Sequence, residues 1–143
     1  MNIELDYSLR EIEDVAKTII ENASSKTLLF YGDLGAGKTT LIKTIVCLLG
    51  SDDIVTSPTF SLVNEYKNKK EIMYHFDFYR IENEDEAYDI GFEEYFTSGK
   101  WLFIEWPENI SNILYGEAIS IKIEKNEKTE GKARNVKINS IIL

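Results

Sequence analysis

The feature that most constrains this chain is a glycine-rich turn between a short apolar run and the start of an apolar helix pattern. Residues 32–39 read Gly-Asp-Leu-Gly-Ala-Gly-Lys-Thr and fit the pattern G-x-x-x-x-G-K-[ST]. Glycines allow positive φ angles and close approach of the backbone to a ligand, and successive backbone N–H groups in such a turn attract an anion. The pattern therefore predicts a phosphate-binding loop (P-loop), in which Lys38 reaches the β and γ phosphates and Thr39 offers its hydroxyl to Mg²⁺.

The residues on either side match the strand and the helix that a P-loop requires. Residues 27–31 form a short, unbroken and mostly apolar run, as expected of a strand buried on both faces. Apolar residues recur at helical spacing over residues 41–49, and Gly50 stands where a helix C-cap glycine is expected. A chance Lys-Thr after an ordinary glycine turn would lack this context, so we favour the functional interpretation.

Length and composition predict a single domain over residues 1–143. There are 25 acidic residues against 16 Lys and Arg, a net charge of −9, which argues against strong direct binding of nucleic acid because that needs basic surface. Cys47 is the only cysteine, so no internal disulfide can form, and its place in an apolar helix predicts an inert core thiol. The chain shows no signal-peptide pattern and no apolar run of transmembrane length, so we expect a cytoplasmic protein that does not bind membranes and is a monomer in isolation.

Alternation between helix and strand patterns predicts an α/β fold. A capping-box pattern at Ser8–Glu11 starts a helix whose apolar face continues to Ile20. A polar turn at residues 68–70 predicts a hairpin, and alternation after residue 118 predicts two further antiparallel strands. The expected architecture is a three-layer P-loop NTPase fold with a mixed central sheet. Its expected strands are 1–7, 27–31, 62–66, 72–77, 100–105, 119–123 and 136–138. The first expected helix starts at residue 9 and ends near residues 22–25, and the others are 41–49, 82–89 and 108–114.

An acidic residue ends the apolar run at residues 100–105. Glu105 follows four apolar residues, and Trp106-Pro107 bends the chain immediately afterwards. Ligands of open α/β sheets bind beyond the carboxyl ends of the strands, so Glu105 is a candidate to hold Mg²⁺ directly or through water. The simpler alternative is a core strand followed by a surface acid.

A second strand end places His75, Asp77 and Tyr79 on one face, because polar and apolar side chains alternate there. Beside a P-loop, Asp77 is a candidate contributor to the metal or water site. The simpler alternative is a half-buried strand end with a solvated charge pair. A lone histidine is more often a satisfied structural residue than a catalyst.

Four motifs occur in one order: Gly32–Thr40 (GDLGAGKTT), Ser57–Phe60 (SPTF), His75–Arg80 (HFDFYR) and Ile104–Glu108 (IEWPE). Together they resemble the TsaE family, also called YjeE, over nearly the whole chain. The P-loop is common to many ATPases and GTPases, whereas the H-x-D-x-Y-R and E-W-P motifs at this chain length are more specific. The resemblance implies a small P-loop ATPase that uses ATP and Mg²⁺, is needed for threonylcarbamoyladenosine at position 37 of tRNA, and supports turnover of the TsaB–TsaD pair. Low activity without those partners is expected.

The resemblance also implies roles for individual residues. Lys38, Asp77 and Glu105 are the catalytic candidates, and Thr39 and Glu105 are the metal ligands. The implied nucleotide contacts are Ser8, Asp33, Gly35, Ala36, Gly37, Lys38, Thr39, Thr40 and Arg134. Ser8 matches a hydroxyl near the base. The stretch Gly131-Lys132-Ala133-Arg134 departs from the family spacing, so either Lys132 or Arg134 is the basic residue that reaches the nucleotide.

Three other functions are compatible with a P-loop. A GTP-driven switch normally carries N-K-x-D, which residues 68–71 imitate, but that stretch ends in Glu and lies in a predicted hairpin turn. A small-molecule kinase needs a lid and an acceptor pocket, for which 143 residues leave little room. A binding module that uses ATP only to hold its shape would bind the nucleotide without hydrolysing it.

Overall fold

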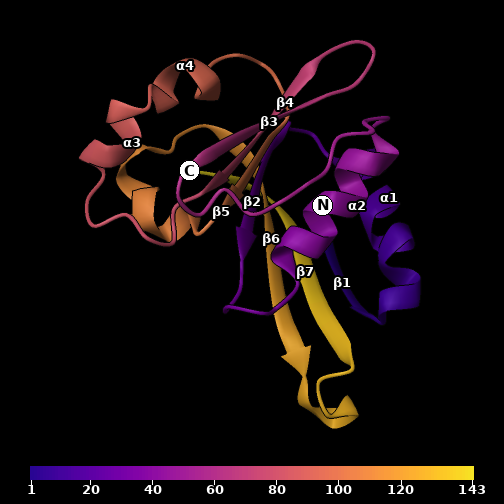
Figure 1. Ribbon diagram of the computed structural model, residues 1–143. Helices are drawn as coiled ribbons and strands as arrows, with labels where there is room; N and C mark the ends of the chain where they lie inside the picture. The colour runs from indigo at the N-terminus through magenta and orange to yellow at the C-terminus, as the bar shows by residue number, and fades with distance from the viewer.

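The computed structural model describes residues 1–143, and one seven-stranded mixed sheet runs through its centre (Figure 1). The strand order is β1-β7-β6-β2-β5-β4-β3. The strands are β1 (Asn2–Tyr7), β2 (Thr27–Tyr31), β3 (Val63–Lys67), β4 (Ile72–Asp77), β5 (Leu102–Glu105), β6 (Glu117–Asn126) and β7 (Ala133–Ile142). Strand β1 lies at the sheet edge, as the sequence predicts, and pairs with β7.

Helices cover both faces of this sheet. Helices α1 (Ile12–Asn22) and α2 (Lys38–Leu48) lie on one side, and α3 (Asp85–Asp89) and α4 (Phe92–Phe96) lie on the other (Figure 1). The remaining helical elements are the 3₁₀ turns η1 (Leu9–Glu11), η2 (Pro107–Ile113) and η3 (Glu127–Thr129). Strand alternation sends Leu28 and Phe30 into the core under α1 and α2, and Leu29 into the core of the other face. The predicted three-layer α/β fold is confirmed.

The parallel centre of the sheet determines where a site can form. Strand β2 lies between β5 and β6 and runs parallel to both, and β4 runs parallel to β5. The carboxyl ends of β2, β4 and β5 therefore meet at one edge, where open α/β sheets bind their ligands. The pairs β3–β4 and β6–β7 are antiparallel, which confirms the two predicted hairpins.

Three local expectations need correction. Helix α3 begins at Asp85 rather than Glu82, because the Glu86 carboxylate accepts the backbone N–H groups of Glu82 and Asn83 and holds them outside the helix. The expected helix at 108–114 is the 3₁₀ turn η2. Cys47 is exposed, because it lies on the solvent side of α2 rather than on the buried stripe. None of the helices combines the length and the apolar character needed to cross a membrane.

Gly32 is the position where the turn after β2 approaches β6 most closely. Its φ is +155°, and a Cβ there would lie 2.7 Å from the carbonyl oxygen of Ile123. We expect Gly32→Ala to lower the free energy of unfolding by about 1–3 kcal/mol, measured in urea, because the backbone must shift to relieve this overlap. Gly99→Ala is the control, since Gly99 also has positive φ (+76°) but no atom within 4 Å of the added Cβ. An equal loss in both variants would contradict the prediction.

Candidate phosphate and metal site

The P-loop forms an open cradle between β2 and α2. Gly35 and Gly37 have φ angles of 78° and 104°, in the left-handed region that glycine tolerates, and Gly37 is the N-cap of α2. The first N–H groups of the eleven-residue helix α2 therefore open toward the cavity above it, where they favour an anion. This cavity of about 400 Å³ is lined by Leu34, Gly35, Gly37, Lys38, Thr39, Thr40, Ser57, Thr59, Asp77, Tyr79, Arg80, Glu105 and Trp106.

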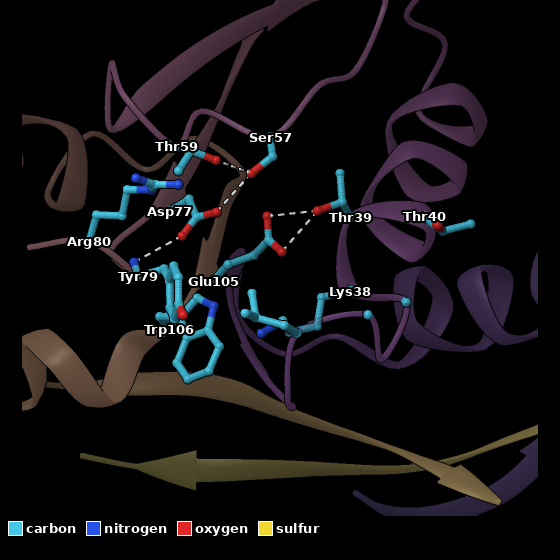
Figure 2. Close-up of a pocket in the computed structure, with 13 residues that line it drawn as sticks. Lys38, Thr39, Thr40, Ser57, Thr59, Asp77, Tyr79, Arg80, Glu105 and Trp106 are labelled. Carbon is cyan, nitrogen blue, oxygen red and sulfur yellow. Dashed lines mark hydrogen bonds between the residues drawn. The ribbon is translucent and has the colours of Figure 1, made fainter. Parts of the chain in front are cut away.

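Thr39 and Glu105 meet inside this cavity although 66 residues separate them. The Thr39 hydroxyl donates to the Glu105 carboxylate, with distances of 3.0 Å to Oε1 and 3.1 Å to Oε2 (Figure 2). Glu105 is 3% exposed and ends β5, as the hydrophobic run before it predicts. Hydroxyl and carboxylate oxygens beside a phosphate cradle are the donor set that Mg²⁺ prefers, so these residues fit the predicted ion.

Asp77 lies at the same sheet edge, in register with Glu105, but its carboxylate is turned to a different partner. Ser57 donates its hydroxyl to Asp77 Oδ2 at 2.8 Å, and the backbone N–H of Tyr79 donates to Oδ1 at 2.9 Å. Figure 2 shows Asp77 facing Ser57 while Glu105 faces Thr39. Asp77 therefore lines the cavity without a hydrogen bond to Thr39.

Lys38 is 5% exposed and does not extend freely into the cavity. Its Nζ donates to the carbonyl oxygen of Gly32 and lies 3.9 Å from the centroid of the Trp106 ring. Burial lowers the pKa of Lys38, and the carboxylates of Glu105, Glu108 and Asp77 oppose that shift. The ammonium group is thus held by a carbonyl and an aromatic face, which a phosphate can replace as the partner of the cation.

Trp106 is held in place by an unusual backbone conformation. Its φ and ψ are 56° and 48°, in the left-handed region that non-glycine residues rarely adopt, and Pro107 follows. Its ring also packs against Tyr79, with centroids 4.9 Å apart. Strained residues of this kind cluster at functional sites.

The cavity also contains residues that no single sequence pattern predicts as site residues. Ser57 and Thr59 come from the segment before β3, and Arg80 comes from the turn after β4. The Arg80 guanidinium lies 4.9 Å from the Phe60 ring centroid. The motifs S-P-T-F and H-x-D-x-Y-R contain all of these residues, so the signal lay in the motifs and not in any single residue.

The C-terminal basic residues take different positions. Arg134 donates from Nε to the carbonyl oxygen of Ala36 at 2.8 Å and from Nη2 to that of Gly35 at 3.5 Å, so its side chain grips the outside of the P-loop. Lys132 is exposed and lines a second cavity of about 230 Å³ beside the P-loop. The second cavity is lined by Tyr7, Leu9, Ile12, Gly37, Thr40, Gly131, Lys132 and Arg134. The Arg134 guanidinium is thus bound to the P-loop backbone, whereas the Lys132 ammonium group makes no hydrogen bond and is free to meet a ligand.

The other residues predicted to contact the nucleotide lie in different places relative to the two cavities. Thr40 lines both cavities. Ser8 lines neither: its hydroxyl donates to Glu11 Oε1 at 3.0 Å, while the neighbouring Tyr7 and Leu9 line the second cavity. Ala36 is buried, and the exposed Asp33 lies on the side of the loop away from the main cavity.

Comparisons with known proteins identify the family of this chain. A family model described as "Threonylcarbamoyl adenosine biosynthesis protein TsaE" matches residues 7–136. The chain is 37% identical to a Rickettsia prowazekii protein over 119 residues, 82% of each chain, and 34% identical to a Haemophilus influenzae protein over 132 residues, 91% of this chain and 81% of the other. Both relatives are named tRNA threonylcarbamoyladenosine biosynthesis protein TsaE.

A solved structure also has the same fold. The crystal structure of Bacillus subtilis YdiB matches with a TM-score of 0.75 and 28% identity, covering 100% of this chain and 88% of that one. Since the family model spans residues 7–136, most of the chain, this protein is a member of the TsaE family.

Proposed function

We propose that this protein takes part in threonylcarbamoyladenosine modification of tRNA as a Mg²⁺-dependent ATP-binding and ATP-hydrolysing protein. Family membership supports the tRNA-modification role. The observation that carries the ATPase role is the pairing of Thr39 with the buried carboxylate of Glu105 at the mouth of the P-loop. This is the arrangement in which P-loop ATPases hold their metal ion.

The residues of the site have distinct tasks in this proposal. Glu105 and the Thr39 hydroxyl would hold Mg²⁺, which would supply positive charge to neutralise the nucleotide phosphates. Lys38 leaves the Gly32 carbonyl and the Trp106 ring and turns to the phosphates, while the N–H groups of the P-loop cradle them. Asp77, fixed by Ser57 and by the Tyr79 backbone, orients the attacking water.

The second cavity suits the nucleoside part of the ligand. It adjoins the P-loop at Gly37 and Thr40, and Tyr7 and Leu9 give it apolar surface against which a base can pack. The free ammonium group of Lys132 can reach a polar edge or a phosphate from the rim. Arg134 contributes indirectly by holding the carbonyl groups of Gly35 and Ala36.

The partner in this proposal is the TsaB–TsaD pair, on which the protein acts as a cytoplasmic accessory ATPase with low activity of its own. A net charge of −9 leaves little basic surface for tRNA, so contact with tRNA runs through the partners rather than through this chain. In isolation the protein is a monomer.

The test is nucleotide binding and hydrolysis by the purified protein, alone and with TsaB–TsaD. We expect ATP to bind more tightly with Mg²⁺ than in EDTA, GTP to bind more weakly than ATP, and phosphate release to rise when the partners are added. Preference for GTP would instead support a switch, and phosphoryl transfer to a metabolite would support a kinase. Binding of ATP without hydrolysis, even with the partners, would contradict the proposed ATPase.

A further inference from the structure

A continuous line of hydrogen bonds runs from the segment before β3 to the P-loop. Tyr66 on β3 lies with its hydroxyl oxygen 3.1 Å from the carbonyl oxygen of Thr56 and 2.8 Å from His75 Nδ1. The other ring nitrogen of His75, Nε2, lies 2.7 Å from Glu105 Oε2. Glu105 then accepts the hydroxyl of Thr39. The segment before β3, β3, β5 and α2 are thereby joined through the imidazole of His75 on β4.

Strand alternation explains why these side chains meet. Met73 on β4 and Phe103 on β5 belong to the core under α1 and α2, so His75 and Glu105, two residues further along each strand, face the same side. Tyr66 on β3 belongs to that core as well. His75 is 0% exposed and Tyr66 is 2% exposed, so the line is shielded from water along its middle.

The chemistry of the partners determines the direction of the central hydrogen bond. An ionised carboxylate only accepts hydrogen bonds, so Nε2 of His75 carries a proton and donates it to Glu105. Burial raises the pKa of Tyr66, so its hydroxyl stays protonated. The hydroxyl donates its one hydrogen to the Thr56 carbonyl, so its oxygen accepts from His75 Nδ1 on the other side of the ring. A buried carboxylate needs hydrogen-bond donors, because an unsatisfied charge in the interior costs roughly several kcal/mol.

These contacts use the two oxygens of Glu105 differently. Oε2 accepts from both His75 and Thr39, whereas Oε1 has only the Thr39 hydroxyl as a partner. The hydrogen bond from His75 therefore occupies Oε2 and fixes the plane of the carboxylate. Oε1 is then the oxygen available to a ligand in the cavity. An imidazole that orients a carboxylate in this way acts on the metal site from outside the set of metal ligands.

We propose that His75 is the positioning residue for Glu105. Tyr66 in turn holds His75 in place, because its hydroxyl contacts both the His75 ring and the Thr56 carbonyl. Ser57, next in the chain, donates to Asp77, so one short segment contacts both acids of the site: Asp77 directly and Glu105 through Tyr66 and His75. The inference rests on the proposed function, because it concerns how the proposed metal-site carboxylate is held.

The first experiment measures the affinity for a fluorescent ATP analogue in Mg²⁺ and in EDTA, and takes the ratio. His75→Phe keeps an aromatic ring but donates no hydrogen bond, so we expect the Mg²⁺ enhancement to fall by about tenfold to a hundredfold with affinity in EDTA unchanged. His75→Gln retains an amide N–H that can reach Glu105 and should recover part of the loss. Tyr66→Phe should show a smaller loss. Tyr74→Phe is the control, because Tyr74 is next to His75 on β4 and its hydroxyl makes no hydrogen bond. This variant should show no loss of the Mg²⁺ enhancement.

Epistasis separates positioning from general support of the fold. If His75 acts through Glu105, His75→Phe in a Glu105→Gln background should cause no further loss of the Mg²⁺ enhancement. Equal losses in Mg²⁺ and in EDTA, or a further full loss in the double variant, would overturn the proposal. If the unsubstituted protein binds no ATP at all, the proposed function fails instead, and this is a separate result.

A second readout needs neither nucleotide nor folding of a variant. His75 is the only histidine, so ¹⁵N spectra of the metal-free protein report one imidazole without ambiguity. We expect a proton on Nε2 that exchanges slowly with water. An unprotonated Nε2, or a proton that exchanges at the rate of a solvent-exposed imidazole, would contradict the hydrogen bond to Glu105 and with it the proposal.

Discussion

Glu105→Gln should lower ATP hydrolysis by at least about a hundredfold while the affinity for ATP in EDTA stays close to that of the unsubstituted protein. Glutamine has the size and reach of glutamate but no charge, so it offers Mg²⁺ a much weaker ligand. Its amide oxygen can still accept from Thr39 and His75, which both contact Oε2 of the carboxylate, but the NH₂ group that replaces the other oxygen only donates and offers no ligand to a cation. Steady-state phosphate release in the assembly with TsaB–TsaD, with nucleotide titrations in EDTA and in Mg²⁺, measures both effects.

Asp77→Asn is the matched comparison, because it removes the other buried acid of the same sheet edge. The Asp77 carboxylate is held by Ser57 and the Tyr79 backbone and not by Thr39. We therefore expect slower turnover, with a smaller change in Mg²⁺-dependent affinity than Glu105→Gln causes. If Glu105→Gln hydrolyses ATP at the parent rate and Asp77→Asn loses the Mg²⁺ dependence, the two acids have exchanged roles and the metal ligand is Asp77.

Lys38→Ala should lower hydrolysis by about a hundredfold to a thousandfold and weaken ATP binding, with the fold intact. The loss follows from removing the cation that meets the β and γ phosphates. The fold should survive because the Lys38 side chain lines the cavity and is not part of the hydrophobic core. Circular dichroism and thermal unfolding test this second half of the prediction.

Two further substitutions identify the cause of any loss. Lys38→Met keeps the long apolar stem against Trp106 but not the charge, so it should match Lys38→Ala in hydrolysis. Lys43→Ala removes an exposed lysine from the same helix and should leave hydrolysis unchanged. Full activity in Lys38→Met would mean that Lys38 serves packing rather than phosphate binding.

The sequence predicts the parts of this site that depend on local patterns. The glycine spacing, the apolar run before it and the helix after it identify the P-loop, and Gly50 ends α2 with the expected positive φ of 93°. The apolar residues before Glu105 identify a buried strand whose last side chain reaches the carboxyl edge of the sheet. In each case a short stretch of chain contains both the signal and the structure that it predicts.

Contacts between distant residues were not predictable in the same way. The hydrogen bond between His75 and Glu105 depends on the register of β4 against β5 and on two side-chain rotamers, and nothing near either residue encodes it. The C-terminal pattern leaves Lys132 and Arg134 as alternatives, and only the packing of β7 places Arg134 against the P-loop carbonyls. Helices α3 and α4, of five residues each, are too short for helical periodicity to indicate where they begin.

The long hairpin formed by β6 and β7, which extends beyond the rest of the sheet in Figure 1, has a consequence for folding kinetics. Arg134 and Ala36 are 98 residues apart, and Thr39 and Glu105 are 66 apart, so only a fragment that spans residues 36–134 contains both pairs. Closing such loops costs entropy before any contact compensates for it, and chains rich in distant pairings fold slowly. A nascent chain therefore cannot assemble the P-loop with its Arg134 support until β7 has been synthesised and has joined the sheet.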